Sequence, residues 1–302
     1  MPIEPSLPNR EDVPLTIDEM NFLLSQEGHS YIAGKAAVEL EIKRFKLQLQ
    51  VDGNKVVPVG ESTDAFLSRF ITVDPTMLQV KEDVHKLAKV EEDKDQLFAV
   101  LINGPTGTGK EILAYALHGD RIGDFIPINC AGLPSELVES ELFGHTKGSF
   151  TNAFTEKQGL MKLANKGTLF LDEVGELPMP AQAKLLRAIQ SKKIRKVGGS
   201  VDEIISCRIV CATHRNLKEM CKNEKFRIDL YSRISTFELN TTELEKRHED
   251  IIPIIESISG GKEFLEALIT NNIHWRDLDL SLNVRSLQQH IKRYKVLQKL
   301  PI

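Results

Sequence analysis

Short apolar runs alternate with amphipathic stretches along the middle of the chain. Apolar runs bounded by turn residues predict buried strands at 97–102, 125–128, 168–171, 208–212 and 236–239. Apolar positions recur at helical spacing in 111–117 and 180–190. Because parallel strands buried on both faces read as unbroken apolar runs, this alternation predicts an α/β fold in which helices sandwich a parallel sheet.

The two ends of the chain carry different patterns. Residues 1–12 hold three prolines and few large apolar groups, which is typical of a loose leader, and 16–26 fit a short helix. The stretch 38–57 fits a helix or two strands, and its Asp-Gly-Asn turn favours a hairpin. Residues after about 245 lose the strand pattern. We therefore expect a small N-terminal module of unknown role at 1–63, an α/β core at 64–244 and a helical lid at 245–302.

The composition is that of an ordinary globular protein. Hydrophobic residues make up 41% and charged residues 27%, and a net charge of -4 gives no overall attraction to nucleic acid or anionic membrane. No apolar run approaches the ~18 residues that span a bilayer, and the N-terminus lacks the pattern of a signal peptide. Cys207 and Cys211 lie in an apolar stretch, so we expect buried free thiols there rather than a metal site. A reduced, cytoplasmic setting without a membrane partner fits these observations.

A glycine-rich loop lies between the first expected strand and the first expected helix. It consists of Gly104, Pro105, Thr106, Gly107, Thr108, Gly109 and Lys110. Glycines let successive backbone N–H groups turn toward phosphate oxygens, and the following helix adds its positive end. We expect Lys110 to reach the outer phosphates of ATP, while Glu111 stands where a magnesium-binding hydroxyl usually follows the lysine. The alternative, a glycine-rich turn with a chance lysine, is disfavoured by the strand–loop–helix context.

Two acidic residues follow the strand expected at 168–171. A carboxylate at the C-terminal end of a parallel strand lies beside the phosphate crevice. We expect Asp172 to hold Mg²⁺ through water, and Glu173 to orient and deprotonate the attacking water. Alone, such a pair is usually a solvated turn. Together with the phosphate loop, it predicts an ATPase that converts ATP and water to ADP and phosphate.

The order of the motifs from about 70 to 293 resembles the AAA+ ATPase domain of bacterial sigma-54-dependent transcription activators. The phosphate loop of that family also carries Glu after Lys, as Glu111 does here. Asn129 matches a residue thought to switch the catalytic glutamate, which here is Glu173. The most diagnostic feature resembles the loop that contacts sigma-54, normally Gly-Ala-Phe-Thr-Gly-Ala. In this chain it reads Gly148, Ser149, Phe150, Thr151, Asn152 and Ala153.

Later motifs extend the resemblance to the AAA+ family. The run 196–199 resembles a second insertion that works with the contact loop, and Thr213 matches the first sensor. Arg227 and Arg233 resemble arginine fingers that reach the nucleotide of the neighbouring subunit, and Arg285 resembles the second sensor, which reaches the bound nucleotide. Shared sites of this kind imply a homo-oligomeric ring, and we expect a hexamer.

Three functions remain open on the sequence alone. In the first, ATP hydrolysis drives remodelling of sigma-54 RNA polymerase for transcription activation. In the second, an ATPase of the same ancestry remodels a different protein or nucleic-acid partner. Asn152, which replaces a family glycine, favours the second, as does the expectation of no DNA-binding domain after the lid and no receiver domain before the core. The third is a nucleotide-responsive scaffold with little turnover, which is disfavoured by Asp172, Glu173, Arg227 and Arg233.

Overall fold

A computed structural model describes residues 62–90, 97–150 and 153–300 of the chain. All of them belong to one unit, Leu49–Ile302. The helix expected at 16–26 and the hairpin expected at 38–57 lie outside the described residues, as does nearly all of the N-terminal module. The proposed boundaries between the three parts of the chain stay predictions.

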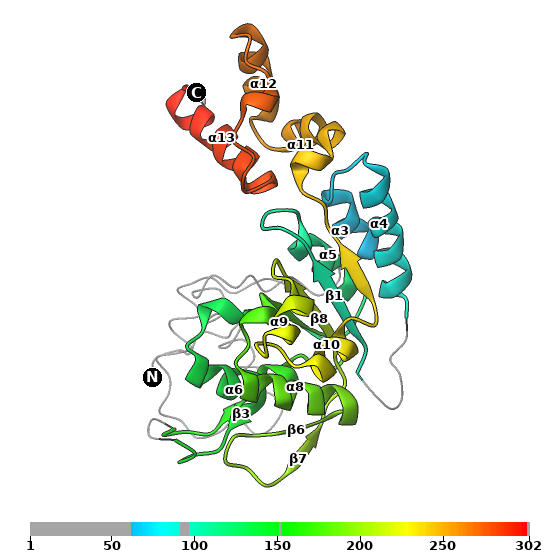
Figure 1. The fold of residues 1–302 in the computed structure, drawn as a ribbon, viewed down its shortest axis with the longest axis vertical. Coiled ribbons are helices and arrows are strands. Elements are labelled where there is room, and N and C mark those ends of the chain that lie inside the picture. The colour runs from blue at the N-terminus through cyan, green and yellow to red at the C-terminus, as the bar shows by residue number, and fades with distance from the viewer. Residues whose placement is uncertain (1–61, 91–96, 151–152, 301–302) are drawn as a thin grey trace, which may run out of the picture. The chain divides into compact units, whose positions relative to one another are not determined.

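A five-stranded parallel sheet lies at the centre of the described fold (Figure 1). Its strands, in the order β2-β5-β8-β1-β9, are β2 (Phe125–Asn129), β5 (Thr168–Asp172), β8 (Arg208–Thr213), β1 (Ala99–Asn103) and β9 (Glu238–Asn240). Every neighbouring pair is parallel. The five predicted strands match these segments to within two residues at each end, so the α/β fold prediction is confirmed.

Helices pack on the sheet because its side chains alternate between two apolar faces. On one face Val100 and Ile102 of β1 share a hydrophobic core with three helices, whereas Leu101 between them lies outside that core. These helices are α3 (Thr63–Arg69), α4 (Pro75–Ala88) and α5 (Lys110–His118). The other helices of the α/β part are α6 (Ser135–Phe143), α7 (Leu160–Leu163), α8 (Met179–Ser191), α9 (Leu217–Lys222) and α10 (Ile228–Ile234).

Two short antiparallel hairpins, absent from our sequence predictions, extend from the α/β part. One pairs β3 (Gly144–His145) with β4 (Lys157–Gln158), and the other pairs β6 (Lys193–Arg195) with β7 (Asp202–Ile204). The first hairpin brackets the expected contact loop at 148–153. A bridge between His145 and Val197 joins it to the run 196–199. The joint action of the two insertions stays a prediction.

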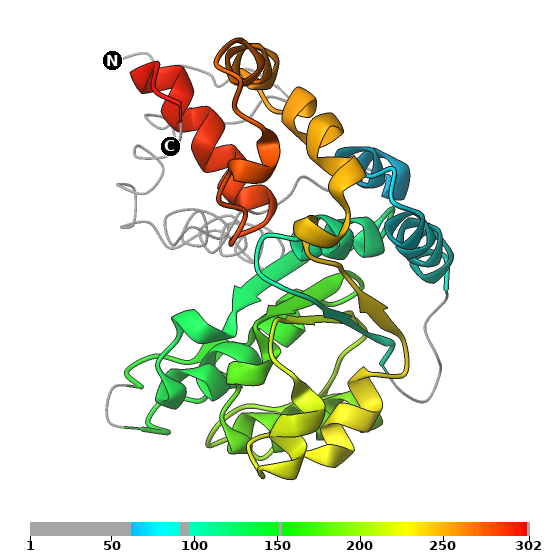
Figure 2. The same cartoon turned by 45° about the horizontal axis from the view of Figure 1, so that its top comes forward.

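The C-terminal part is helical, as predicted, and has its own core (Figure 2). Its helices are α11 (Ile251–Ser257), α12 (Gly261–Thr270) and α13 (Val284–Leu297), and Phe264, Leu268, Leu287 and Ile291 lie at the centre of their packing. Short 3-10 turns are η1 (Cys130–Gly132), η2 (Val174–Glu176), η3 (Leu244–Lys246), η4 (His248–Asp250) and η5 (Trp275–Asp277). None of the helices in the described ranges combines the length and apolar character needed to cross a bilayer.

Candidate nucleotide site

One cavity of about 680 Å³ brings together ten of the fifteen residues predicted for the ATP site. Its polar wall comes from the glycine-rich loop, the ends of β2 and β5, and the start of α13. The predicted residues that line it are Thr106, Gly107, Thr108, Gly109, Lys110, Glu111, Asn129, Asp172, Glu173 and Arg285. The lining also includes the apolar or aromatic residues Phe66, Phe70, Tyr115, Ile254 and Ile258. A lining that combines polar groups of the loop with apolar and aromatic side chains suits a ligand that carries phosphates and a flat ring system.

The glycine-rich loop between β1 and α5 is held in place by the C-terminal part. Gly107 has a φ of 78°, and a Cβ atom there would lie 2.0 Å from the carbonyl oxygen of Leu282. The side-chain amide of Asn283 donates to the carbonyl of Thr106 at 2.9 Å, and the backbone N–H of Val284 donates to the carbonyl of Gly107 at 3.1 Å. Glycine is therefore required at Gly107 by both its backbone angle and this close approach.

Lys110 is the first residue of α5, and its side chain turns back into the loop. Its ammonium group donates to the carbonyls of Gly104 at 2.7 Å and Pro105 at 2.9 Å. Burial lowers the pKa of Lys110, the carboxylates of Glu173 and Asp172 oppose that effect, and the charge of Arg285 adds to it. The charges of Glu173, Asp172 and Arg285 therefore all act on the buried ammonium group of Lys110.

Asp172 and Glu173 lie next to each other where β5 ends. Burial raises the pKa of Asp172, and the nearby charge of Glu173 raises it further, while Lys110 lowers it. A half-buried pair of carboxylates offers the oxygen ligands that Mg²⁺ prefers, so the donor set fits this ion. Glu173 has a left-handed backbone with φ 53° and ψ 50°, a conformation that costs a non-glycine residue about 1–2 kcal/mol.

His214, which the sequence analysis left without a role, contacts the predicted base. Its Nδ1 lies 2.7 Å from Oε2 of Glu173. Thr213, the predicted sensor, is fully buried at the end of β8, and its hydroxyl accepts from the backbone N–H of Arg215 at 3.0 Å. The side-chain oxygen of Asn129 accepts from the N–H of Ala131 at 2.9 Å. The sequence offered one signal that His214 belongs to the site, namely its position directly after Thr213 in the motif of the predicted sensor.

Glu111 lines the cavity from the first turn of α5. Its carboxylate accepts a hydrogen bond from the hydroxyl of Tyr115 at 3.3 Å. Burial, and then the charge of Glu111, raise the pKa of Tyr115, so that this hydroxyl keeps its proton. Phe66 of α3 stacks on the Tyr115 ring with centroids 5.4 Å apart. Glu111, Tyr115 and Phe66 therefore lie in contact with one another in the lining of the cavity.

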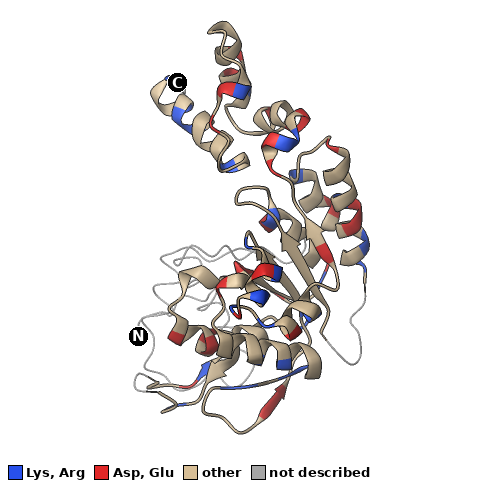
Figure 3. Ribbon diagram, in the orientation of Figure 1, with Lys and Arg blue, Asp and Glu red and all other residues tan. Residues whose placement is uncertain are grey.

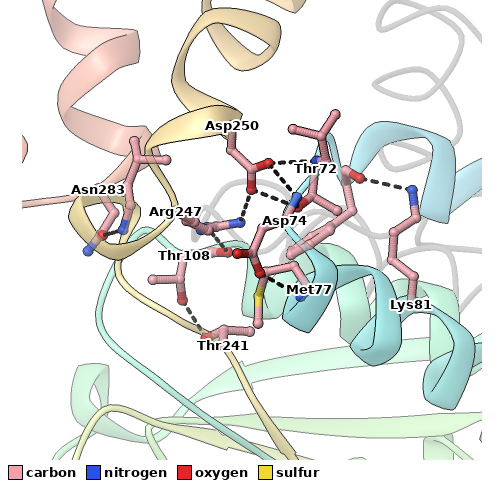
Figure 4. Close-up of polar contacts among 12 residues, drawn as sticks. Thr72, Asp74, Met77, Lys81, Thr108, Thr241, Arg247, Asp250 and Asn283 are labelled. Carbon is pink, nitrogen blue, oxygen red and sulfur yellow. Dashed lines mark hydrogen bonds and ion pairs between the residues drawn. The ribbon is translucent and has the colours of Figure 1, made fainter.

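A buried polar network under the loop was not predicted (Figure 4). Arg247 and Asp250 form an ion pair at 3.2 Å with side chains 1% and 0% exposed. A second nitrogen of the Arg247 guanidinium donates to the carbonyl of Thr108 at 3.3 Å. The carboxylate of Asp250 accepts from the Thr72 hydroxyl at 2.6 Å and from the N–H groups of Val73 and Asp74. The network therefore joins the loop, the start of the C-terminal part and the segment that leads into α4.

The base of the loop is fixed by the end of β9. The hydroxyl of Thr108 lies 2.6 Å from that of Thr241 and donates to the carbonyl of Pro105 at 2.9 Å. The N–H of Thr241 donates to the carbonyl of Asn103 at 2.8 Å. Thr241 follows a predicted strand, but its sequence neighbours gave no sign of this contact.

The predicted contact loop is closed at its base, and two of its residues, Thr151 and Asn152, lie outside the described ranges. Gly148 N–H donates to the carbonyl of Ala153 at 2.8 Å, and Ala153 N–H donates to that of Phe150 at 2.9 Å. The ring of Phe150 packs edge-on against His145, with centroids 4.9 Å apart, and the residue is 37% exposed. Ser149 has a buried hydroxyl. The described part of the loop therefore presents one partly exposed aromatic ring.

The two predicted arginine fingers are not among the residues that line the cavity of their own chain. Arg227 forms a two-point ion pair with Asp229, at 3.0 Å and 2.7 Å, and is partly exposed. Arg233 is an exposed residue of α10.

Figure 3 shows basic and acidic residues interspersed along the described helices, in keeping with the small net charge.

Comparison with known proteins identifies the family of this arrangement. Residues 70–240 match the family model described as the Sigma-54 interaction domain. The response regulator protein PilR of Pseudomonas aeruginosa is 46% identical over 235 residues, which cover 75% of this chain and 52% of PilR. The regulatory protein AtoC of Escherichia coli is 38% identical over 304 residues, which cover 96% of this chain and 60% of AtoC. The chain therefore spans between half and two thirds of the length of these relatives.

A solved structure supports the fold. The crystal structure of NtrX from Brucella abortus in complex with ATP superposes with a TM-score of 0.61 at 24% identity, covering 94% of this chain and 62% of that one. The Hsp104 structure with FITC casein superposes with a TM-score of 0.53 at 19% identity over 77% of this chain. At these identities the likeness concerns the fold alone. It agrees with the AAA+ architecture that the sequence motifs imply.

Proposed function

Because this chain belongs to the Sigma-54 interaction domain family, we propose that it is an AAA+ ATPase that couples ATP hydrolysis to remodelling of sigma-54 RNA polymerase. The observation that carries the proposal is that one cavity gathers the phosphate loop, Asp172, Glu173 and Arg285. Lys110 is buried and is influenced by the charges of two acids, and the loop before it requires glycine at Gly107. Both features support phosphate binding followed by hydrolysis.

Each element of the cavity has a role in the proposed reaction. The backbone N–H groups of the loop, the N-terminus of α5 and Lys110 bind the phosphates. Mg²⁺, when bound, supplies positive charge that neutralises the phosphate oxygens. Asp172 supplies a carboxylate to that ion, and Glu173 accepts the proton of the attacking water. Arg285, whose charge already influences the pKa of Lys110, adds a cation on the side of the C-terminal part.

The proposed assembly is a ring in which neighbouring subunits share sites. Arg227 and Arg233 are absent from the cavity lining of their own chain and reach solvent. This placement supports a role in the site of the next subunit, where an arginine supplied in trans raises NTPase rates by ~10³–10⁵ in other systems. Head-to-tail contacts of this kind close into rings, and we propose a hexamer. Phe150, partly exposed at the contact loop, is the proposed point of contact with sigma-54.

A second candidate function keeps the same ATPase and changes its target. Asn152 stands where the family has glycine in the contact loop. Asparagine tolerates a positive φ better than most residues, yet less readily than glycine. This one substitution favours a different protein or nucleic-acid partner over sigma-54.

Hydrolysis is tested by phosphate release from the purified full chain over a range of protein concentrations. We expect turnover per subunit to rise with concentration, because assembly completes the site. Glu173→Gln should abolish turnover, whereas Glu263→Gln, at an exposed position of α12, should leave it within about twofold of wild type. Equal turnover in Glu173→Gln and wild type would refute the assignment of the base.

The target is tested by pull-down of sigma-54 in the presence of ADP and aluminium fluoride, which together mimic the hydrolysis transition state. We expect a complex, and we expect Phe150→Ala to abolish it while ATP hydrolysis continues. If no complex forms in conditions where a known activator binds sigma-54, the second candidate function replaces the first.

A further inference from the structure

Asn283 joins the phosphate loop to the C-terminal part through both ends of its side-chain amide. The nitrogen donates to the carbonyl of Thr106 at 2.9 Å, and the oxygen accepts from the backbone N–H of Leu244 at 2.6 Å. Asn283 is 4% exposed and Leu244 is fully buried. On the basis of the proposed ATP hydrolysis, we propose that Asn283 is a positioning residue for the N–H groups of the loop that bind phosphate.

The hydrogen bond to Thr106 matters because it sets the direction of the N–H group of Gly107. A trans peptide group is planar, and its N–H points away from its carbonyl oxygen. Since Asn283 holds the carbonyl of Thr106, the N–H of Gly107 is directed to the opposite side of that peptide group. A donor held in one direction before the ligand arrives raises affinity, because less freedom is lost on binding.

The next two peptide groups of the loop are held in the same way. The carbonyl of Gly107 accepts from the N–H of Val284 at 3.1 Å. The carbonyl of Thr108 accepts from the guanidinium of Arg247 at 3.3 Å (Figure 4). Within the described residues, the N–H groups of Gly107, Thr108 and Gly109 donate to no acceptor, and all three residues line the cavity. Successive N–H groups of this kind form a nest for an anion.

The conformation of Asn283 does not serve its own helix. Asn283 is the N-cap of α13, where an asparagine side chain ordinarily accepts from an N–H of the first turn. Among the described residues of that turn, it accepts from none. Its backbone has φ 57° and ψ -132°, a region that glycine occupies readily and other residues rarely adopt. The side chain is thus directed to Thr106 and Leu244 although a cap is forgone and the backbone is strained.

The test compares Asn283→Gly with Asn283→Ala. Both remove the two side-chain hydrogen bonds, whereas only glycine relieves the backbone. ATP binding is measured by isothermal titration of the full chain carrying Glu173→Gln, so that ATP is not consumed. We expect both variants to raise the Kd about tenfold, which corresponds to the loss of one hydrogen bond of about 1.4 kcal/mol. If Asn283→Ala does not fold, Asn283→Gly decides alone.

A second measurement separates binding from chemistry. In chains that retain Glu173, Asn283→Gly should raise the KM for ATP by a similar factor and leave kcat within about threefold of wild type. The reason is that Asp172 and Glu173 follow β5 and are not contacted by Asn283 in the described structure. A tenfold lower kcat with an unchanged KM would contradict the proposed role.

The matched control is Leu268→Ala, which loosens the C-terminal part without touching the loop. Leu268 is 1% exposed in the core of that part and does not line the cavity. It should lower the urea midpoint at least as much as Asn283→Gly does and leave the Kd within about twofold. Wild-type affinity in Asn283→Gly, or an equal loss in the control, would overturn the inference. If the chain with Asn283 intact binds no ATP, or Glu173→Gln retains turnover, the proposed function fails instead.

Discussion

Replacing Asp250 by Ala perturbs the most buried ion pair among the described residues. The change leaves the guanidinium of Arg247 charged in surroundings where it is 1% exposed. It also removes the acceptor for the hydroxyl of Thr72 and for the N–H groups of Val73 and Asp74. The perturbation therefore disturbs the loop, the C-terminal part and the entry to α4 together.

The magnitude follows from these lost partners. Removing one member of a buried ion pair costs about 3–5 kcal/mol. The N–H groups of Val73 and Asp74 belong to exposed or partly exposed residues, so their loss of an acceptor adds less than the about 1–3 kcal/mol of a fully buried N–H. We expect the free energy of unfolding to fall by about 4 kcal/mol in Asp250→Ala. The neighbouring pair of Lys246 and Glu243 is 68% and 42% exposed, so Glu243→Gln should cost less than about 1 kcal/mol.

The assay is urea unfolding followed by the fluorescence of Trp275, the single tryptophan of the chain. Trp275 packs against the core of the C-terminal part, so it reports on the region that contains Asp250. The double variant Arg247→Met with Asp250→Leu should recover much of the loss, because apolar side chains of similar volume often replace a buried pair at little cost. A loss below about 1 kcal/mol in Asp250→Ala would refute the reasoning.

Three further outcomes are expected. Gly107→Ala should weaken binding of a fluorescent ATP analogue at least about tenfold, because the new Cβ meets the Leu282 carbonyl at 2.0 Å, and unchanged affinity would contradict this. Burial, then the charges of two arginines, lower the pKa of His118 to about 4. The pKa of an unfolded histidine is about 6.5, so the contribution of neutral His118 to the free energy of unfolding is complete above pH 6.5. As the pH falls toward 4, urea titrations should show this contribution being lost by about 1.4 kcal/mol per pH unit. The variant His118→Gln should lack this dependence on pH. Ellman's reagent should label only Cys221 in the folded protein, because the other three cysteines are buried and burial raises the pKa of Cys211 to about 12. Rapid labelling of all four cysteines without denaturant would contradict this burial.

The parallel sheet could be predicted because burial on both faces leaves a strong pattern. All six residues of β8 are buried, and the sequence predicted a strand over five of them. Asp172 and Lys110 were expected near each other for a topological reason, since parallel strands present their C-terminal ends at one edge. The structure places both in the cavity lining. Sequence pattern and sheet topology were sufficient for this half of the site.

Short elements left too little pattern to predict. The hairpin of β6 and β7 has three residues in each strand, and only Ile194 among them is buried. An alternating pattern cannot be recognised over so few positions. Helix α4, in contrast, carried an available signal that went unused, namely Asp74 as N-cap followed by Pro75 at the first helical position.

The buried polar contacts around the loop could not be predicted because they join residues far apart in the sequence. Asn283 and Thr106 are 177 residues apart, and Arg247 and Thr108 are 139 apart. An asparagine or arginine is more often exposed than buried, so no local pattern marks such a partner. Yet these two contacts, together with the hydrogen bond from Val284 to Gly107, bind three successive carbonyls of the loop region 106–108 to the C-terminal part. A ligand shifts a conformational equilibrium only if it binds the alternative conformations with different affinity. Phosphate binding in the loop therefore acts on the C-terminal part to the extent that it alters these hydrogen bonds.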